Sequence, residues 1–214
     1  MIFYTKEVLE SINNHNVTVV AATKYFTSNE MRELYNTGIT NFGENRVERL
    51  LEKQFDLADL DITWHLIGTL QTKKAKKILN TIDYLHSLDT MKLALEIQKR
   101  RLKKLDCFIQ VNISGEESKH GLSPDQVVDF IKELQHLDKI NVIGLMGMAK
   151  LTKDEDIINN EFQKLNDLQT TIKKELNIDV SELSIGMSND YLIAIKHNAT
   201  FLRLGSVLFK KEVL

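Results

Sequence analysis

Short runs of β-forming residues alternate with longer segments of helical period along the chain. The first run, 17–22, is Val-Thr-Val-Val-Ala-Ala, which is typical of a strand buried on both faces. Such alternation is typical of a parallel sheet whose strands are joined by crossover helices. It predicts strands at 17–22, 39–42, 62–67, 84–87, 106–113, 140–146, 183–185 and 200–204, and helices up to about 14 and at 28–37, 44–55, 73–79, 91–104, 123–136, 154–176 and 189–198.

Two of the predicted helices carry clear start signals. Thr27 and Glu30 have capping-box spacing before the helix at 28–37, which Gly38 is expected to end. The segment 123–126 is Ser-Pro-Asp-Gln, with a cap, a proline at the first helical position and a glutamine at the capping-box position. These signals place the helices between strands, as a βα repeat requires.

Eight strand–helix units in 214 residues predict a single (β/α)8 TIM barrel that occupies residues 1–214 as one domain. A doubly wound open sheet is the competing architecture. It is disfavoured because no G-x-G-x-x-G follows the first strand and because open sheets of this kind have fewer parallel strands. One proline and nine glycines leave no flexible linker to mark a second domain.

Charge and composition exclude several function classes. The 28 Lys and Arg nearly balance the 30 Asp and Glu, so no overall field attracts nucleic acid or a membrane surface, and no apolar run is long enough to span a bilayer. The 43% hydrophobic content is that of a globular protein. The N-terminal segment does not resemble a signal peptide, and the single cysteine suits the cytoplasm.

Candidate chemistry lies at the strand ends, where barrel enzymes place their sites. Lys24 ends the first strand, and the mouth of an apolar barrel is expected to desolvate its amine and favour a Schiff base. The alternative is an ordinary surface lysine. Gly186-Met187-Ser188 after the seventh strand and Gly205-Ser206 after the eighth favour the first interpretation, because barrels build phosphate sites from these two loops.

A Schiff-base lysine opposite a phosphate site indicates pyridoxal 5′-phosphate as the cofactor. Arg203 is then near enough to face the pyridine nitrogen. A cation there leaves that nitrogen unprotonated and weakens the ring as an electron sink.

Eight segments spread over almost the whole chain carry a family resemblance. Because these segments occur together and in this order, the chain resembles the pyridoxal phosphate homeostasis protein family. The segments are 21–24 (AATK), 42–45 (FGEN), 64–68 (WHLIG), 110–113 (QVNI), 119–122 (KHGL), 144–146 (GLM), 184–188 (SIGMS) and 203–205 (RLG).

The resemblance implies a barrel of the alanine racemase N-terminal type and a role for each matching residue. Lys24 matches the lysine that forms the aldimine with the cofactor, and Arg203 matches the arginine near the ring nitrogen. The chain departs from the family at Thr69 and Lys74, after the third strand, and at 147–150, after the sixth. The remaining matches are phosphate-binding Ser188, Gly205 and Ser206 with Met187 alongside, and cofactor-lining Asn45, His65 and Met146.

Two functions from different classes follow. The first is a monomeric protein that stores, delivers or buffers pyridoxal phosphate, with PLP-dependent apoenzymes as recipients and no catalytic residue of its own. The resemblance favours it, and no residues are left over for a racemase's second acid/base domain. The second is an enzyme, either an amino-acid racemase or a class I aldolase-like Schiff-base enzyme.

Other conspicuous residues are given simpler interpretations. His65 is equally well explained as a histidine satisfied within the barrel. The lysines at 73–77 are expected to form a solvated face rather than an RNA site, because no aromatic residues interleave with them. No His, Cys and carboxylate grouping has metal-ligand spacing, so no metal site is expected.

Overall fold

Strands and helices alternate through the part of the chain that the computed structural model describes, residues 2–12, 16–116 and 120–210. The strands are β1 (Ile2–Phe3), β2 (Thr18–Ala22), β3 (Asn41–Glu44), β4 (Thr63–Leu66), β5 (Tyr84–Leu88), β6 (Leu105–Val111), β7 (Ile140–Gly147), β8 (Glu182–Ser184), β9 (Phe201–Leu204) and β10 (Phe209–Lys210). The helices are α1 (Thr5–Ile12), α2 (Ser28–Tyr35), α3 (Val47–Asp56), α4 (Thr72–Ile78), α5 (Met91–Arg100), α6 (Val127–Leu134), α7 (Glu155–Leu176) and α8 (Tyr191–Lys196), with 3₁₀ turns η1 (Pro124–Gln126) and η2 (Ser206–Leu208).

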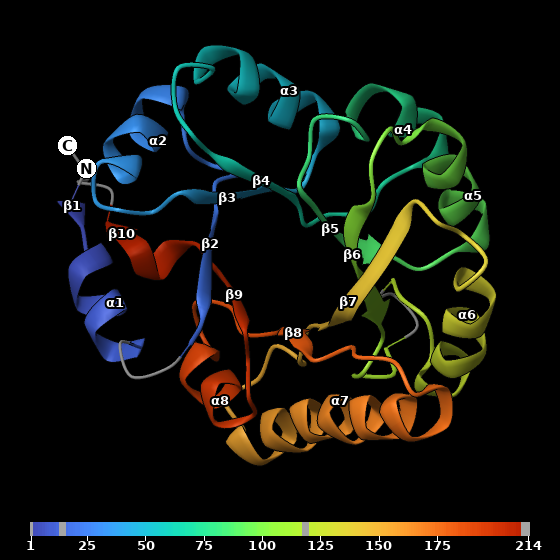
Figure 1. Cartoon of the computed structure of the whole chain (residues 1–214). Helices are drawn as coiled ribbons and strands as arrows, with labels where there is room; N and C mark the ends of the chain where they lie inside the picture. Colours follow the sequence, from blue (N-terminus) through green and yellow to red (C-terminus); the bar gives the residue numbers. More distant parts are fainter. Residues whose placement is uncertain (1, 13–15, 117–119, 211–214) are drawn as a thin grey trace.

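Strands β2 to β9 form a closed parallel barrel in chain order, and α2 to α8 surround it (Figure 1). The barrel closes where β9 pairs with β2, with Arg203 opposite Val20. Because every strand is parallel to its neighbours, all eight carboxyl ends meet at one mouth. The predicted (β/α)8 fold is confirmed.

The capping signals act as the sequence predicts. Thr27 Oγ1 accepts from the Glu30 amide at 3.3 Å, while the Glu30 carboxylate accepts from the Thr27 amide at 2.8 Å. Ser123 and Gln126 form the second capping box. Gly38 follows α2 with a φ of +99°, a conformation that glycine adopts without steric cost.

The helix predicted at 91–104 is shorter than expected, because α5 ends at Arg100. Arg101 has extended backbone angles, and its guanidinium donates to the carbonyl of Leu79. The side-chain oxygen of Asn80 accepts from the amide of Leu102 at 3.0 Å. These tertiary contacts replace the helical hydrogen bonds that the cationic run at 99–104 was expected to continue.

Apolar side chains form two separate cores. The larger one lies between the strands and the surrounding helices. A smaller core inside the barrel consists of Val20, Phe108, Met146 and Phe201. The buried polar residues include His65, His86, Ser184 and Arg203, so the barrel lumen has to satisfy buried hydrogen-bonding groups.

Strands β1 and β10 form an antiparallel pair outside the barrel, with Phe3 opposite Phe209. The hydrophobic pattern did not predict this pair. It joins the two ends of the described chain (Figure 1). The Phe209 ring packs edge-on against Phe26, in the loop that follows Lys24, with ring centroids 4.4 Å apart.

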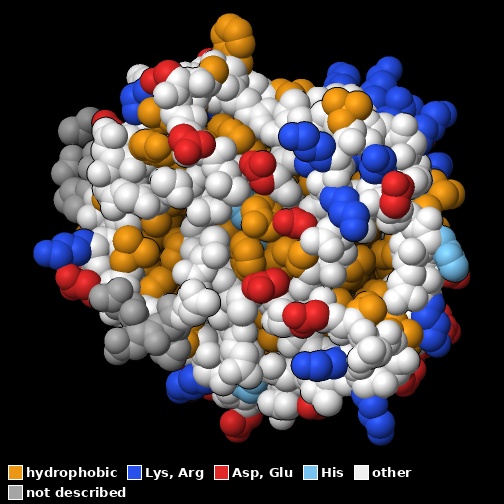
Figure 2. Space-filling model, viewed as in Figure 1, with side chains coloured by type: hydrophobic (Ala, Val, Ile, Leu, Met, Phe, Trp, Pro, Cys, Tyr) orange, Lys and Arg blue, Asp and Glu red, His pale blue; other side chains and the backbone are white. Residues whose placement is uncertain are grey.

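Lysine and arginine side chains gather over α4 and α5 on the face seen in Figure 2. Lys73, Lys76 and Lys77 are exposed, and Lys74 forms an ion pair with Glu48 at 2.9 Å. Within 2–12, 16–116 and 120–210, no helix has the length and hydropathy needed to cross a bilayer.

Candidate functional site

The predicted site residues belong to strands that are neighbours in the barrel. Pairing of β8 with β9, β9 with β2, and β2 with β3 brings four strand ends together at the mouth. Lys24 follows β2 and Asn45 follows β3. Ser188 follows β8, and Gly205 with Ser206 follows β9. Residues far apart in the chain therefore lie at one edge of the barrel.

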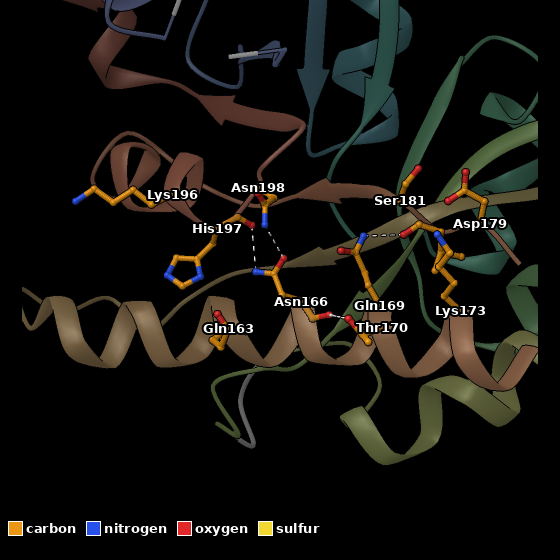
Figure 3. A pocket seen from close by; sticks show the side chains of 11 residues that line it. Gln163, Asn166, Gln169, Thr170, Lys173, Asp179, Ser181, Lys196, His197 and Asn198 are labelled. Carbon is orange, nitrogen blue, oxygen red and sulfur yellow. Dashed lines mark hydrogen bonds between the residues drawn. The ribbon is translucent and has the colours of Figure 1, made fainter. Parts of the chain in front are cut away.

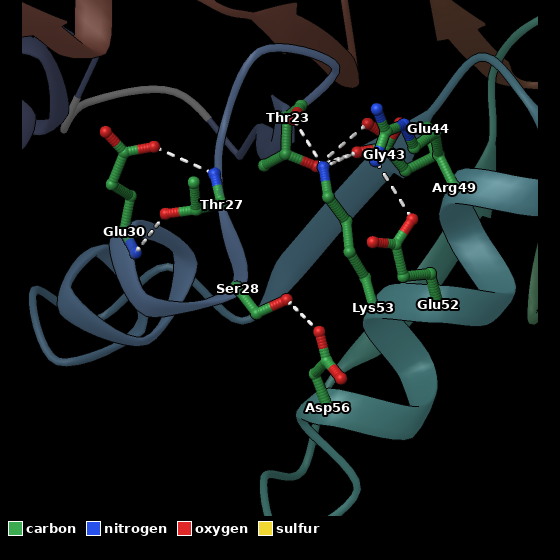
Figure 4. Close-up of polar contacts among 10 residues, drawn as sticks. All are labelled: Thr23, Thr27, Ser28, Glu30, Gly43, Glu44, Arg49, Glu52, Lys53 and Asp56. Carbon is green, nitrogen blue, oxygen red and sulfur yellow. Dashed lines mark hydrogen bonds and ion pairs between the residues drawn. The ribbon is translucent and has the colours of Figure 1, made fainter.

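A buried ion pair holds the backbone next to Lys24 (Figure 4). Lys53 of α3 donates to the carbonyl of Thr23 at 2.6 Å and pairs with the carboxylate of Glu44. Thr23 Oγ1 donates to the same carboxylate at 2.7 Å. The Lys53 and Glu44 side chains are only 5% and 1% exposed. The end of β2 is thus tied to β3 and α3.

Lys24 itself is exposed, which corrects the expectation that the barrel mouth desolvates its amine. Its Nζ lies 4.7 Å from the centroid of the Tyr25 ring. A hollow of about 480 Å³ lies beside it, lined by the loop 24–27, the start of α2 and α3. Lys24 is exposed because it lies two residues beyond β2, where the chain has left the apolar barrel wall.

The loops after β8 and β9 are joined through one hydroxyl. Ser188 Oγ accepts from the amide of Gly205 at 3.1 Å and from the amide of Val207 at 3.3 Å. Backbone amides that converge on one oxygen are the donors that a phosphate group uses. Before Ser188, the Met187 amide donates to the Asp190 carboxylate at 2.5 Å, which fixes the turn into α8.

Each of the two loops that Ser188 joins contains a glycine. A Cβ built on Gly205 would lie 3.9 Å from Ser188 Oγ and 3.7 Å from the carbonyl oxygen of Ala22, so a side chain there would point between β2 and the Ser188 loop. Gly186 has a φ of +87°, and a Cβ on it would lie 2.7 Å from Ala194 and Leu202. A Cβ at Gly186 would therefore clash with α8 and β9, whereas a Cβ at Gly205 would make ordinary van der Waals contacts.

Arg203 lies inside the barrel and is 5% exposed. One terminal nitrogen donates to both the carbonyl and the hydroxyl of Ser184, each at 2.6 Å, and the other donates to the carbonyl of Gly147 at 3.0 Å. Burial lowers the pKa of Arg203 to about 10, against the attraction of Asp190. The guanidinium remains charged at neutral pH and is held rigidly.

His65 and Met146 lie deeper in the barrel than the loop residues. Met146 is 1% exposed and belongs to the interior apolar core. His65 is fully buried, with its Nδ1 3.0 Å from His86 and its Nε2 2.9 Å from Asn41. Burial lowers the pKa of His65 to about 3, so the ring is neutral. Direct contact of either residue with a cofactor stays a prediction.

The sequence interpretation missed four residues that organise this site: Glu44, Lys53, His86 and Ser184. Lys53 had a signal, because it falls on the apolar stripe of α3 with Val47 and Leu50. His86 also had one, because strand alternation puts it on the same face of β5 as Tyr84. Glu44 and Ser184 stand in the segments 42–45 and 184–188 that carry the family resemblance, but neither was assigned a role there.

A second hollow of about 480 Å³ lies between α7 and the segments around β8 and α8 (Figure 3). Its amide side chains are occupied by the fold. Asn166 donates to the carbonyl of His197 at 3.1 Å, and Gln169 donates to the carbonyl of Val180 at 2.6 Å. Within the described residues, no grouping of three or more His, Cys, Asp or Glu could hold a metal ion.

Known proteins resemble this chain over most of its length. Residues 7–212 match the family model of the alanine racemase N-terminal domain. A pyridoxal phosphate homeostasis protein of Aquifex aeolicus is 38% identical over 89% of this chain and 85% of its own. The structure of PipY from Synechococcus elongatus without PLP has a TM-score of 0.89 at 30% identity, covering 96% of this chain and 100% of PipY.

A PipY structure with PLP bound is also similar, with a TM-score of 0.85 at 29% identity over 95% of this chain and 99% of PipY. Alanine racemase from Corynebacterium glutamicum shares the fold, with a TM-score of 0.79 at 11% identity over 98% of this chain and 60% of the racemase. The family match, the level of identity and the coverage agree. This chain belongs to the pyridoxal phosphate homeostasis protein family, whose fold is that of the alanine racemase N-terminal domain.

Proposed function

We propose that this protein binds pyridoxal 5′-phosphate at the barrel mouth, holds it through Lys24, and acts in the homeostasis of that cofactor. Relatives named for this role and a PLP-bound PipY structure support the proposal. Ser188, Gly205 and Ser206 are the proposed phosphate-binding residues, with Met187 beside them. Asn45, Met146 and His65 are proposed to line the site directly or from below.

One observation carries the proposal. A serine hydroxyl joins the loops after β8 and β9 by accepting two backbone amides, and the next strand of the barrel leads to Lys24. Phosphate oxygens are stronger acceptors than a hydroxyl. A phosphate group can therefore replace the Ser188 hydroxyl as the acceptor of the Gly205 and Val207 amides. An amine at one end and amide donors at the other match the two functional ends of pyridoxal phosphate.

When bound, pyridoxal phosphate supplies an aldehyde that condenses with a lysine amine and releases water. The chain's own residues prepare for this. The exposed Lys24 amine is free to meet the cofactor from solvent, while Lys53 and Glu44 keep the end of β2 fixed. Arg203 offers only N–H donors, so a ring nitrogen facing it has to act as an acceptor.

The donor-only guanidinium of Arg203 also favours a role in holding the cofactor over amino-acid racemisation. A pyridine nitrogen that accepts from Arg203 carries no proton and withdraws electrons poorly, which disfavours a carbanion. We therefore propose no catalytic residue in this chain. Racemisation of alanine at a rate well above that of free pyridoxal phosphate would contradict this part of the proposal.

We further propose that the protein is a single-domain cytoplasmic monomer that supplies PLP-dependent apoenzymes. The lone cysteine, Cys107, supports the proposed compartment. Sedimentation velocity of the purified protein tests the monomer. Loading of an apoenzyme across a dialysis membrane, compared with loading in direct mixture, tests whether transfer needs contact.

The visible absorption spectrum, recorded before and after borohydride reduction, tests the cofactor site. The wild type is expected to be yellow, and reduction is expected to fix the cofactor onto the peptide that contains Lys24. Lys24→Ala is expected to lose that adduct, while Lys150→Ala, at another exposed lysine, keeps it. A colourless wild type that pyridoxal phosphate cannot reconstitute would favour the aldolase-like Schiff-base alternative.

A further inference from the structure

The barrel interior holds an unbroken line of hydrogen bonds, here called the interior network. It starts at Arg203, whose terminal nitrogen is 2.6 Å from Ser184 Oγ. Ser184 Oγ is 2.8 Å from Nδ1 of His86, and Nε2 of His86 is 3.0 Å from Nδ1 of His65. The line ends at Asn41, whose Oδ1 is 2.9 Å from Nε2 of His65.

The two ends of the interior network fix the direction of its protons. Arg203 has only donors, and Asn41 presents an oxygen that only accepts. Ser184 therefore accepts from Arg203 and donates its hydroxyl hydrogen to Nδ1 of His86. Each imidazole in turn accepts at Nδ1 and donates from Nε2. All members are satisfied when both rings are neutral and carry their proton on Nε2.

The interior network crosses the barrel rather than following its wall. His86 lies on β5 and Ser184 on β8, and two strands separate them in the sheet. The His86 ring stacks on Phe108 with centroids 4.4 Å apart, and the His65 ring stacks on Tyr84 at 4.6 Å. Packing on these faces holds both imidazoles in the orientation that the hydrogen bonds require.

The interior network stabilises the buried charge of Arg203. Among the described residues, no carboxylate forms an ion pair with the guanidinium, which is almost completely buried. Its partners are neutral oxygens of Ser184 and Gly147. Because each member of the interior network points its acceptor toward Arg203, the aligned dipoles favour the buried positive charge.

We propose that His86, acting through Ser184, is a positioning residue that fixes the orientation of Arg203 and thereby the protonation state of the ligand nitrogen that Arg203 faces. This inference rests on the proposed function, in which that ligand is pyridoxal phosphate. It assigns His86, which has no role in the proposed function, a role at the ring end of the site, separate from the phosphate end at Ser188.

The first test uses the wild-type protein before any cofactor is added. Nitrogen-15 NMR of the histidine rings is expected to give the Nε2–H tautomer for His65 and His86. Both signals are expected to stay unchanged from about pH 8 to about pH 5, because neither ring titrates in the range of an ordinary histidine. An Nδ1–H tautomer or a titrating His86 would overturn the proposal.

The second test compares His86→Leu, which cannot accept from Ser184, with His86→Gln, whose amide can both accept and donate. Each is loaded with pyridoxal phosphate labelled with nitrogen-15 in its ring. His86→Leu is expected to shift the ring nitrogen toward its protonated value and to weaken binding about tenfold, the effect of one charge-assisted hydrogen bond. His86→Gln is expected to restore the wild-type values.

The phosphorus-31 signal of the same samples separates positioning from general damage. It reports the phosphate end and is expected to be the same in all three proteins. The proposal would be overturned if the ring-nitrogen chemical shift were the same in the wild type and both variants. It would also be overturned if the phosphorus and nitrogen signals moved together in both variants. A wild type that takes up no pyridoxal phosphate contradicts the proposed function instead, and the tautomer result then stands as a separate observation.

Discussion

At the scale of single residues, Lys53 and Glu44 form an ion pair that water hardly reaches. Lys53→Met removes the cation and leaves a carboxylate that is 1% exposed without its partner. We expect the free energy of unfolding to fall by about 3–5 kcal/mol, the usual effect of breaking a buried pair. Urea unfolding measures it.

The double variant Lys53→Met/Glu44→Gln provides the control for that prediction. It removes both charges and keeps an oxygen that can accept from Thr23. The double variant is expected to be more stable than Lys53→Met alone, because no buried charge remains unpaired. Two variants of equal stability would show that lost packing of the lysine chain, rather than charge, explains the effect.

The buried histidines make stability depend on pH. Burial lowers the pKa of His65 to about 3 and also lowers the pKa of His86, while both titrate near about 6.5 in the unfolded chain. Below about pH 6.5 the unfolded state binds more protons than the folded state. The free energy of unfolding therefore decreases as the pH is lowered, by up to about 1.4 kcal/mol per pH unit for each histidine. His86→Gln should reduce the dependence of the free energy of unfolding on pH by the contribution of one histidine. Urea unfolding between about pH 6 and pH 4 measures it. An unchanged pH dependence would contradict a neutral His86.

At the scale of elements, the loops after β3 and β4 are in backbone contact at Gly68. A Cβ on Gly68 would lie 2.4 Å from the carbonyl oxygen of Asn45. Gly68→Ala must therefore push the two loops apart, and we expect a loss of about 1–3 kcal/mol in stability together with weaker binding of pyridoxal phosphate. Thermal unfolding and cofactor titration measure both. Thr69→Ala, at the exposed neighbouring position, should change neither.

Local signals decided which elements the sequence could predict. The capping boxes at Thr27 and Ser123 act within four residues, so the helix starts they predict are close to the observed ones. The end of α5 depends instead on Asn80 and Leu79, which lie on another unit of the barrel. The partners of Arg203 and His86 were hidden for the same reason, since both cross the lumen.

At the scale of the whole molecule, the barrel was predictable because its order is the order of the chain. Each strand pairs with the next, so eight repeats of one pattern define the topology. The pair of β1 and β10 has no such support. Its strands are two residues long and come from opposite ends of the chain, so no periodicity indicates that they meet.

That terminal pair nevertheless acts on the candidate site, and Phe209→Ala tests the connection. Phe209 packs on Phe26, whose amide donates to the carbonyl of Thr23 at 2.9 Å, next to Lys24. Removing a half-buried ring is expected to destabilise the protein by about 2 kcal/mol and to lower the Tm by roughly 4–8 °C. The matched control is Phe55→Ala, which removes a ring that is 86% exposed and should leave the Tm unchanged.

Hydrogen exchange distinguishes a local effect from a global one. If the terminal pair supports the loop that carries Lys24, the Phe26 amide exchanges faster in Phe209→Ala by more than the loss of global stability requires. Core amides of β6, far from the substitution, should follow the global change alone. Equal acceleration at Phe26 and in β6 would mean that the termini stabilise the barrel as a whole and leave the Lys24 loop to the Lys53–Glu44 pair.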